Sequence, residues 1–267
     1  MNGPLKNVMP WVLLALLPVS ALAHFQVVLI PETLLEDGGT QTLKMPFSHP
    51  ADGGPVMPME KPISLHVWDK EGLKDVTETL QPLRWTSATN TGDAWQAEYN
   101  FKALGDHIFV LAPQPYFDKP ENKYIQQFTK SIINVGAFPT HWDKELGLNA
   151  EIVPMVAPYA ILTGSNFSGV VKSNGKPVPN ADVEVEFVNY DLDTENNKYS
   201  DEQKVSLPSD VFVTQTIKTD SNGVFHYSIP HEGFWGFSAL AVGSEKELNG
   251  EELSQDAVIW VQARDFK

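Results

Sequence analysis

Residues 181–188 read Ala181-Asp-Val-Glu-Val-Glu-Phe-Val188, and this stretch decides the fold class. From Ala181 to Phe187 its apolar and acidic side chains alternate strictly, which is the period of a β-strand with one face in the core and the other in water. The side chains expected on the core face are Val183, Val185 and Phe187. Those expected to be solvated are Asp182, Glu184 and Glu186. The stretch therefore predicts a half-buried strand.

The segments on either side continue the pattern. Residues 167–172 read as a strand, and residues 173–180 as a turn rich in Gly, Pro and Asn. After an acidic loop over 189–209, further strands are expected at 212–219, 224–229, 236–242 and 257–263. About seven short strands at this spacing are typical of an antiparallel β-sandwich.

Two turns in this half carry a resemblance. The runs Gly169-Val-Val-x-x-x-Gly175-Lys-Pro-Val-Pro-Asn-Ala181 and Thr219-Asp-x-Asn-Gly223-x-Phe-x-Tyr resemble the transthyretin-like or carboxypeptidase-regulatory type of sandwich. In such a module, Gly175 and Gly223 would adopt positive φ, and Asp220 and Asn222 would tie the turn through side-chain hydrogen bonds. The resemblance implies a fold and says little about function.

The amino-terminal half also reads as short strands between turns. They are expected at 24–30, 40–47, 64–68, 94–101, 107–112 and 129–135, while periodicity leaves 124–130 open to a short helical turn. Residues 151–159 contain Pro154 and Pro158 in extended apolar surroundings, which favours a stiff connector over a central strand. We therefore predict an all-β protein of two antiparallel β-sandwich modules, Ig-like or transthyretin-like, at 24–150 and 161–267, joined by a connector at 151–160.

Composition excludes several classes of function. The 267 residues contain no cysteine, so disulfides, zinc–thiolate sites and a cysteine nucleophile are impossible. The net charge of −15 opposes binding to nucleic acid or to an anionic membrane, because both need a cationic face. No nucleophile elbow, phosphate-binding loop or dinucleotide fingerprint occurs, so an enzyme is not expected.

Residues 1–23 have the order of a secretory signal peptide. Lys6 precedes a short apolar run at 11–17, and Ala21-Leu-Ala23 forms a cleavage site. The apolar run is too short to span a bilayer, so we expect cleavage after Ala23, no stable membrane anchor, and a periplasmic or secreted protein.

Cleavage there would leave His24 as the first residue. Its free α-amine and imidazole can chelate one metal ion together, and a further His would complete a nitrogen set suited to Cu(II) or Ni(II). His49 is the preferred partner, since it lies in the Gly/Pro-rich loop Ser48-His-Pro-Ala-Asp-Gly-Gly54. Met57 and Met59 follow this loop and could supply thioethers, which favour Cu(I), or could pack beneath it.

The remaining histidines are weaker candidates. His66 and His107 lie in alternating strand patterns and could face His24 or be ordinary sheet residues. The others are His141, which could share a cation with Asp143, His226 and His231. The aromatic residues Tyr116, Tyr124, Trp142 and Trp235 could form a stacking platform, or an interface between the modules.

Taken whole, residues 24–263 resemble bacterial periplasmic proteins that carry a domain of unknown function and are associated with nickel and cobalt uptake. The motifs that carry the resemblance are Ala23-His24-Phe, Phe47-Ser-His-Pro-x-x-Gly-Gly54-x-x-Met57-x-Met59-x-x-Pro62, Gly105-Asp-His-Ile-Phe, Lys123-Tyr-Ile-Gln126 and Gly233-Phe-Trp-Gly236. The resemblance implies handling of a transition metal outside the cytoplasm.

Three functions follow, in order of preference. The first is a non-catalytic accessory protein that binds nickel, cobalt or copper as a divalent ion through His24 and passes it to a membrane metal transporter. The second is a two-module β protein that binds a protein or a glycan, with structural histidines. The third and weakest is copper-dependent oxidative chemistry at the amino terminus.

Overall fold

The computed structural model describes residues 24–266, and nearly all of their regular structure is β-strand. Two single 3-10 turns, η1 (Thr77–Thr79) and η2 (Asp210–Phe212), are the helices of these residues. Neither has the length or the apolar character needed to cross a membrane. The prediction of an all-β, sandwich-like fold is confirmed. The signal peptide expected at 1–23 lies outside the described residues.

A twelve-stranded sheet forms the middle of the molecule. Its main path runs in the order β19 (Gln215–Lys218), β16 (Asp182–Phe187), β21 (Gly233–Ala239), β23 (Glu251–Arg264), β11 (Lys123–Val135), β9 (Gly105–Ala112), β5 (Ser64–Asp69) and β6 (Gly72–Asp75). Four short strands pair with β11 or β23, namely β2 (Leu34–Leu35), β10 (Tyr116–Asp118), β13 (Ile161–Leu162) and β22 (Glu247–Leu248).

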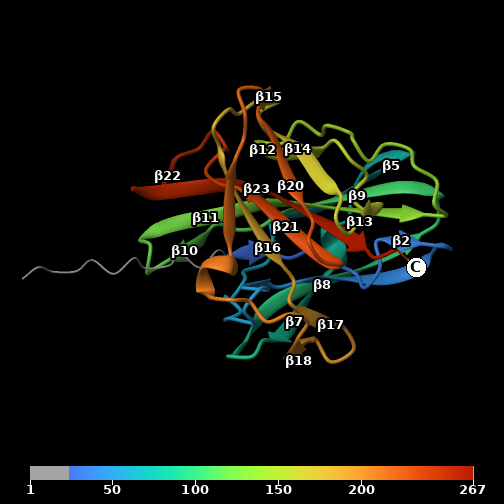
Figure 1. Cartoon of the computed structure of the whole chain (residues 1–267), viewed down its shortest axis with the longest axis horizontal. Coiled ribbons are helices and arrows are strands. Elements are labelled where there is room, and N and C mark those ends of the chain that lie inside the picture. The colour runs from blue at the N-terminus through green and yellow to red at the C-terminus, as the bar shows by residue number, and fades with distance from the viewer. Residues whose placement is uncertain (1–23, 267) are drawn as a thin grey trace, which may run out of the picture.

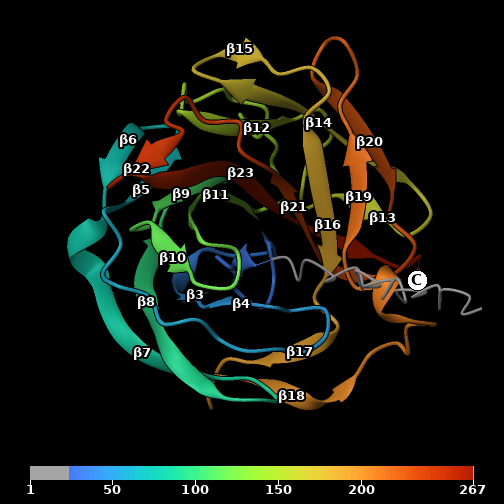
Figure 2. The ribbon, with the colours of Figure 1, turned by 90° about the vertical axis from the view of Figure 1, so that its left-hand side faces the viewer.

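Two smaller sheets lie on opposite sides of this central sheet (Figures 1 and 2). One has four strands, β12 (Ala150–Pro154), β14 (Asn166–Ser173), β15 (Lys176–Pro177) and β20 (Val224–Ser228). The other has five, β17 (Tyr190–Asp193), β18 (Lys198–Gln203), β7 (Leu80–Thr86), β8 (Thr91–Phe101) and β3 (Gly39–Met45). A two-stranded sheet of β1 (Phe25–Gln26) and β4 (Phe47–Ser48) lies near the middle of the view in Figure 2.

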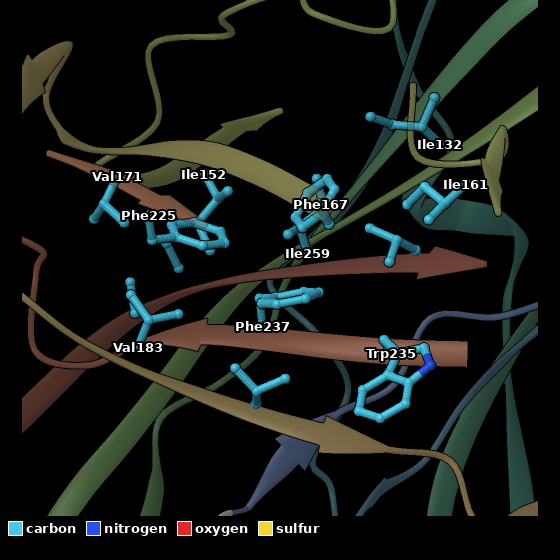
Figure 3. Close-up of a cluster of buried hydrophobic side chains, with 14 of the residues drawn as sticks. Ile132, Ile152, Ile161, Phe167, Val171, Val183, Phe225, Trp235, Phe237 and Ile259 are labelled. Carbon is cyan, nitrogen blue, oxygen red and sulfur yellow. The ribbon is translucent and has the colours of Figure 1, made fainter. Parts of the chain in front are cut away.

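The largest core lies between the four-stranded sheet and the central sheet. Phe167 and Phe225 from the small sheet pack against Phe237 of β21, with ring centroids 4.8 and 5.5 Å away, respectively (Figure 3). Val183, Val185 and Phe187 of β16 belong to the same cluster, as their alternation predicts.

A second core lies on the other side of the central sheet. Phe25 of β1 packs edge-on against Trp260 of β23, at 5.7 Å between ring centroids. Trp85 of β7 and Tyr199 of β18 belong to the same cluster. The start of the described chain is therefore held against the middle of the fold.

The pairing of β11 with β23 joins the two halves of the chain. These strands run parallel over nine residue pairs, from Lys123 opposite Glu252 to Ser131 opposite Trp260. Strands from residues 64–135 and from residues 161–264 thus share one sheet. The division into modules at 24–150 and 161–267 stays a prediction.

The structure decides one point that the sequence left open and changes some local expectations, among them the loop over 189–209, which contains β17 and β18. Residues 124–130 are part of β11 and form no helical turn, because all of them pair with β23, and Tyr124 and Ile125 also pair with β10. The expected connector begins inside β12, which pairs with β14 from Ala150 to Pro154. β12 is an edge strand, where a proline breaks no ladder on its open side.

The turn residues behave as predicted. Gly175 and Gly223 both have φ of 76°, a conformation that strains residues with a side chain. The Asp220 carboxylate accepts hydrogen bonds from the backbone N–H groups of Asn222 and Val224, at 2.8 and 2.9 Å. These contacts fix the turn between β19 and β20.

Candidate functional site

The position of His24 is set by its neighbours in sequence. Phe25 and Gln26 pair with Ser48 and Phe47, respectively, in an antiparallel ladder. The Gln127 side chain of β11 donates to the His24 carbonyl at 2.7 Å and accepts from the Gln26 N–H at 2.7 Å. His24 is therefore held at the sheet surface, with only 15% of its side chain exposed.

His49 lies directly beside His24. The two ring centroids are 4.6 Å apart, and the rings are tilted by 54°. His49 follows β4 and is buried in the loop that returns at Gly54, whose N–H donates to the His49 carbonyl at 3.2 Å. The aromatic rings of Phe47 and Tyr116 lie 5.6 and 6.2 Å from the His24 ring.

A carboxylate completes this group. Asp118 Oδ2 lies 3.7 Å from His24 Nε2, and Asp118 is 2% exposed. The residue ends β10, where it pairs with Lys123 of β11. We call His24, His49 and Asp118 the amino-terminal cluster. Sequence reasoning missed Asp118, because no motif or spacing connects it with His24; the pairing of β10 with β11 brings them together.

Burial changes the proton affinity of two members of the amino-terminal cluster. It lowers the pKa of His24, while the charge of Glu121 opposes this change and that of Lys123 adds to it. It raises the pKa of Asp118, assisted by the charge of Glu121. A lowered pKa favours the neutral imidazole, which is the form that binds a metal ion.

The described side chains alone do not form a metal site. Across residues 24–266, no group of three or more His, Cys, Asp or Glu side chains is arranged to hold a metal ion. Two imidazoles and a carboxylate are nevertheless close in the amino-terminal cluster. A further donor, such as an α-amine at His24, and small side-chain rotations would be needed to coordinate an ion.

The two methionines differ in their surroundings. Met57 is buried, its N–H donates to the Phe47 carbonyl at 2.8 Å, and its side chain packs with Phe47 and Ile125. Met59 is half-buried and lines a cavity of about 410 Å³ with Phe47 and Tyr116. Met57 thus has the surroundings of a packing residue, and the thioether role stays a prediction for both.

His66 and His107 have other neighbours. His107 is buried, its Nε2 lies 3.0 Å from the Ala103 carbonyl, and its ring packs edge-on against Phe101. His66 is half-buried in β5 and lines a different cavity with Trp68 and Lys144. His107 pairs with Ile133 of β11, whereas His24 is held by Gln127 of the same strand. Ile133 and Gln127 are six residues apart, so the two histidines are separated by about 20 Å along the strand.

The other histidines and aromatic residues are also dispersed. The ring of His141 packs on Trp68, His226 contacts the Ser168 hydroxyl, and His231 contacts the Glu232 carbonyl. Tyr116 and Tyr124 line the same cavity, whereas Trp142 and Trp235 pack in the largest core. The four aromatic residues therefore form no common platform.

The expectation of solvated acids on β16 is wrong for Glu186. Glu186 is 1% exposed, and the Thr214 hydroxyl donates to its Oε1 at 2.5 Å. Burial raises its pKa well above the ordinary value, assisted by the charge of Asp52. The loop after His49 covers this face of the strand, and the Ala51 N–H donates to the Glu186 carboxylate.

Comparisons with solved structures find distant similarities. The D0–D1 domain of intimin is 12% identical, with a TM-score of 0.22 over 86% of this chain and 95% of that one. A Salmonella alpha-2-macroglobulin reacted with methylamine is 12% identical, with a TM-score of 0.24 over 89% of this chain and 14% of that one. A putative carbohydrate binding protein from Bacteroides uniformis is 10% identical, with a TM-score of 0.24 over 77% of this chain and 90% of that one.

No curated protein matches the chain in sequence. A family model does match it, over residues 21–243. The chain belongs to the family described as domain of unknown function DUF4198.

Proposed function

We propose that the protein captures a divalent transition metal ion, nickel, cobalt or copper, outside the cytoplasm and passes it to a membrane metal transporter. The observation that carries the proposal is the contact between His24 and His49, whose ring centroids are 4.6 Å apart. Signal cleavage after Ala23 would add an α-amine to these imidazoles. Nitrogen donors of this kind suit Ni(II), Co(II) and Cu(II).

Two further observations support the proposal. Gln127 and the β1–β4 ladder hold His24 in place, so a metal ion need not order a frayed terminus. The net charge of −15 attracts divalent cations, although it selects none of them. The resemblance to proteins associated with nickel and cobalt uptake agrees with this role.

Release to a transporter would proceed by ligand exchange. The amine and both imidazoles must be unprotonated to bind, so affinity falls as the pH decreases. His24 already favours its neutral form through burial. Proton uptake by the freed nitrogen donors would therefore accompany metal release.

Metal-dependent stabilisation tests the proposal. The processed protein should melt at a higher temperature as free Ni(II) or Cu(II) increases, and His24→Ala and His49→Ala should each remove this shift. His226→Ala is the matched control, because His226 is exposed on β20, and it should leave the shift intact. A wild-type melting temperature that does not respond to any of the three metals would refute the proposal.

A second candidate is binding of a glycan or a peptide. Four aromatic side chains, Phe47, Tyr116, Phe117 and Tyr124, line the cavity next to the amino-terminal cluster, and such rings stack on sugars and apolar side chains. This candidate predicts ligand-dependent quenching of protein fluorescence that Tyr124→Ala abolishes and metal chelators do not change.

A further inference from the structure

Asp118 carries a buried carboxylate oxygen that lacks a hydrogen-bond partner. Its Oδ2 is fully buried and accepts no hydrogen bond within residues 24–266, whereas the same carboxylate accepts the Glu121 N–H. Leaving a buried polar atom unsatisfied costs free energy, and native structures contain few such atoms. The orphaned oxygen therefore needs a physical explanation.

The orphaned oxygen faces His24. Asp118 Oδ2 and His24 Nε2 are 3.7 Å apart, which is too long for a hydrogen bond. The two atoms thus face each other without a direct bond, at a separation that an ion placed between them could bridge.

The sheet holds Asp118 in this position. β10 pairs with β11 at three positions, ending with Asp118 opposite Lys123. The Tyr116 ring on the same strand packs edge-on against Phe47, at 5.5 Å between centroids. A carboxylate on a paired and packed strand is preorganised for a ligand.

We infer that Asp118 is the carboxylate ligand of the amino-terminal cluster, which then takes a divalent cation through nitrogen and oxygen donors. The inference rests on the proposed function and narrows it. Met57, one of the two methionines considered as thioether ligands, packs against Phe47 and Ile125. A site with imidazole, amine and carboxylate donors favours Ni(II), Co(II) or Cu(II) over the softer Cu(I).

The carboxylate also matches the charge of such an ion. The residue opposite Asp118 on β11 is Lys123, and its ammonium pairs with Glu121 at 2.5 Å. Asp118 is thus left to neutralise part of a double positive charge in a buried place. Two imidazoles alone would leave that charge uncompensated.

Titration of the processed protein with NiCl2 tests the inference. Asp118→Asn keeps the acceptor for the Glu121 N–H and removes the charge, and it should weaken Ni(II) binding by about 100-fold or more, beyond the ~10–100-fold typical of residues outside the first ligand shell. Glu121→Gln is the matched control. It removes a charge that acts on His24 without contacting it, and should change affinity by less than about threefold.

The outcomes separate the inference from the proposed function. If the wild type binds Ni(II) and Asp118→Asn binds equally well, the inference is wrong and the proposed function stands. An equal loss in both variants would mean that Asp118 acts only through its charge, which also overturns the inference. If the wild type does not bind, the proposed function fails.

A measurement on the wild type covers the case in which Asp118→Asn does not fold. X-ray absorption at the nickel edge of the loaded protein should show nitrogen and oxygen neighbours and no sulfur shell. A sulfur neighbour would contradict the inferred donor set and would point to Met57 or Met59.

Discussion

Glu184 lies on the covered face of β16 and has an unusual proton affinity. Burial raises its pKa to about 7, and the charge of Asp256 contributes in the same direction. Because the folded state binds this proton more tightly than the unfolded chain does, the contribution of Glu184 to stability is present below about pH 4.5. It is lost as the pH rises from 4.5 to 7.

Replacing Glu184 by Gln should therefore stabilise the protein at high pH only. We expect Glu184→Gln to unfold at the same denaturant concentration as the wild type near pH 4.5. At pH 8 its free energy of unfolding should be higher than that of the wild type by about 1–3 kcal/mol. Urea unfolding at both pH values measures the difference. Asp182→Asn on the same strand is the control; an equal effect of that substitution would contradict the assignment to Glu184.

The residues show where a local pattern stops being informative. Alternation correctly placed Val183, Val185 and Phe187 in the core. It could not show that the loop after His49 covers the opposite face of β16, because that loop lies more than a hundred residues away in sequence. For the same reason the sequence indicated the histidines of the amino-terminal cluster and not Asp118.

At the scale of elements, a buried ion pair ties β11 to β12 and to the loop before β12. Lys130 Nζ lies 2.5 Å from Glu151 Oε1, and both side chains are fully enclosed. Glu151 also accepts the backbone N–H groups of Leu146, Gly147 and Leu148 at 2.8 to 3.1 Å. The pair therefore fixes the path of the chain into the four-stranded sheet.

Breaking this pair should destabilise the fold strongly. Lys130→Met leaves the Glu151 charge buried without its partner, and should cost about 3–5 kcal/mol in unfolding free energy. Lys130→Met combined with Glu151→Gln should recover part of this loss, because Gln keeps an acceptor for the loop and carries no charge. Chemical denaturation measures all three proteins.

A surface pair supplies the control for this experiment. Lys218 and Asp182 form an ion pair between β19 and β16, and both side chains are exposed. Lys218→Met should cost less than about 1 kcal/mol. If Lys130→Met lowered the free energy of unfolding by no more than Lys218→Met does, the claim that burial makes the loss of the Lys130–Glu151 pair costly would be wrong.

The positions of the strands in the sequence were easier to predict than the strands with which they pair. The expected strands at 64–68, 94–101 and 107–112 lie within β5, β8 and β9. Residues 124–130 were ambiguous because β11 is enclosed on both sides and lacks a clean alternation: Gln127, Thr129 and Lys130 are all buried. Period alone cannot identify such a strand.

At the scale of the whole molecule, the parallel pairing of β11 with β23 makes the two halves of the chain interdependent. Nine consecutive residue pairs join segments about 130 positions apart. No local sequence pattern predicts which residues of two such distant strands pair. The polypeptide 24–150 would expose the whole edge of β11 that β23 covers.

The isolated half should therefore not fold stably. We expect residues 24–150 to lack a cooperative thermal transition and to expose apolar surface that binds a hydrophobic dye, whereas residues 24–267 should unfold in one transition. Scanning calorimetry and dye fluorescence test this expectation. A cooperative transition in the isolated half would show instead that it is an independent module.

The central claim concerns the amino terminus of the processed protein. Isothermal titration with Ni(II) should compare the protein that begins at His24 with one that carries a single extra residue before it. The extra residue converts the α-amine of His24 to an amide and leaves both imidazoles in place, so we predict tight binding to the first protein and a loss of about 100-fold or more in the second. Equal affinity in the two proteins would contradict metal capture through the mature amino terminus.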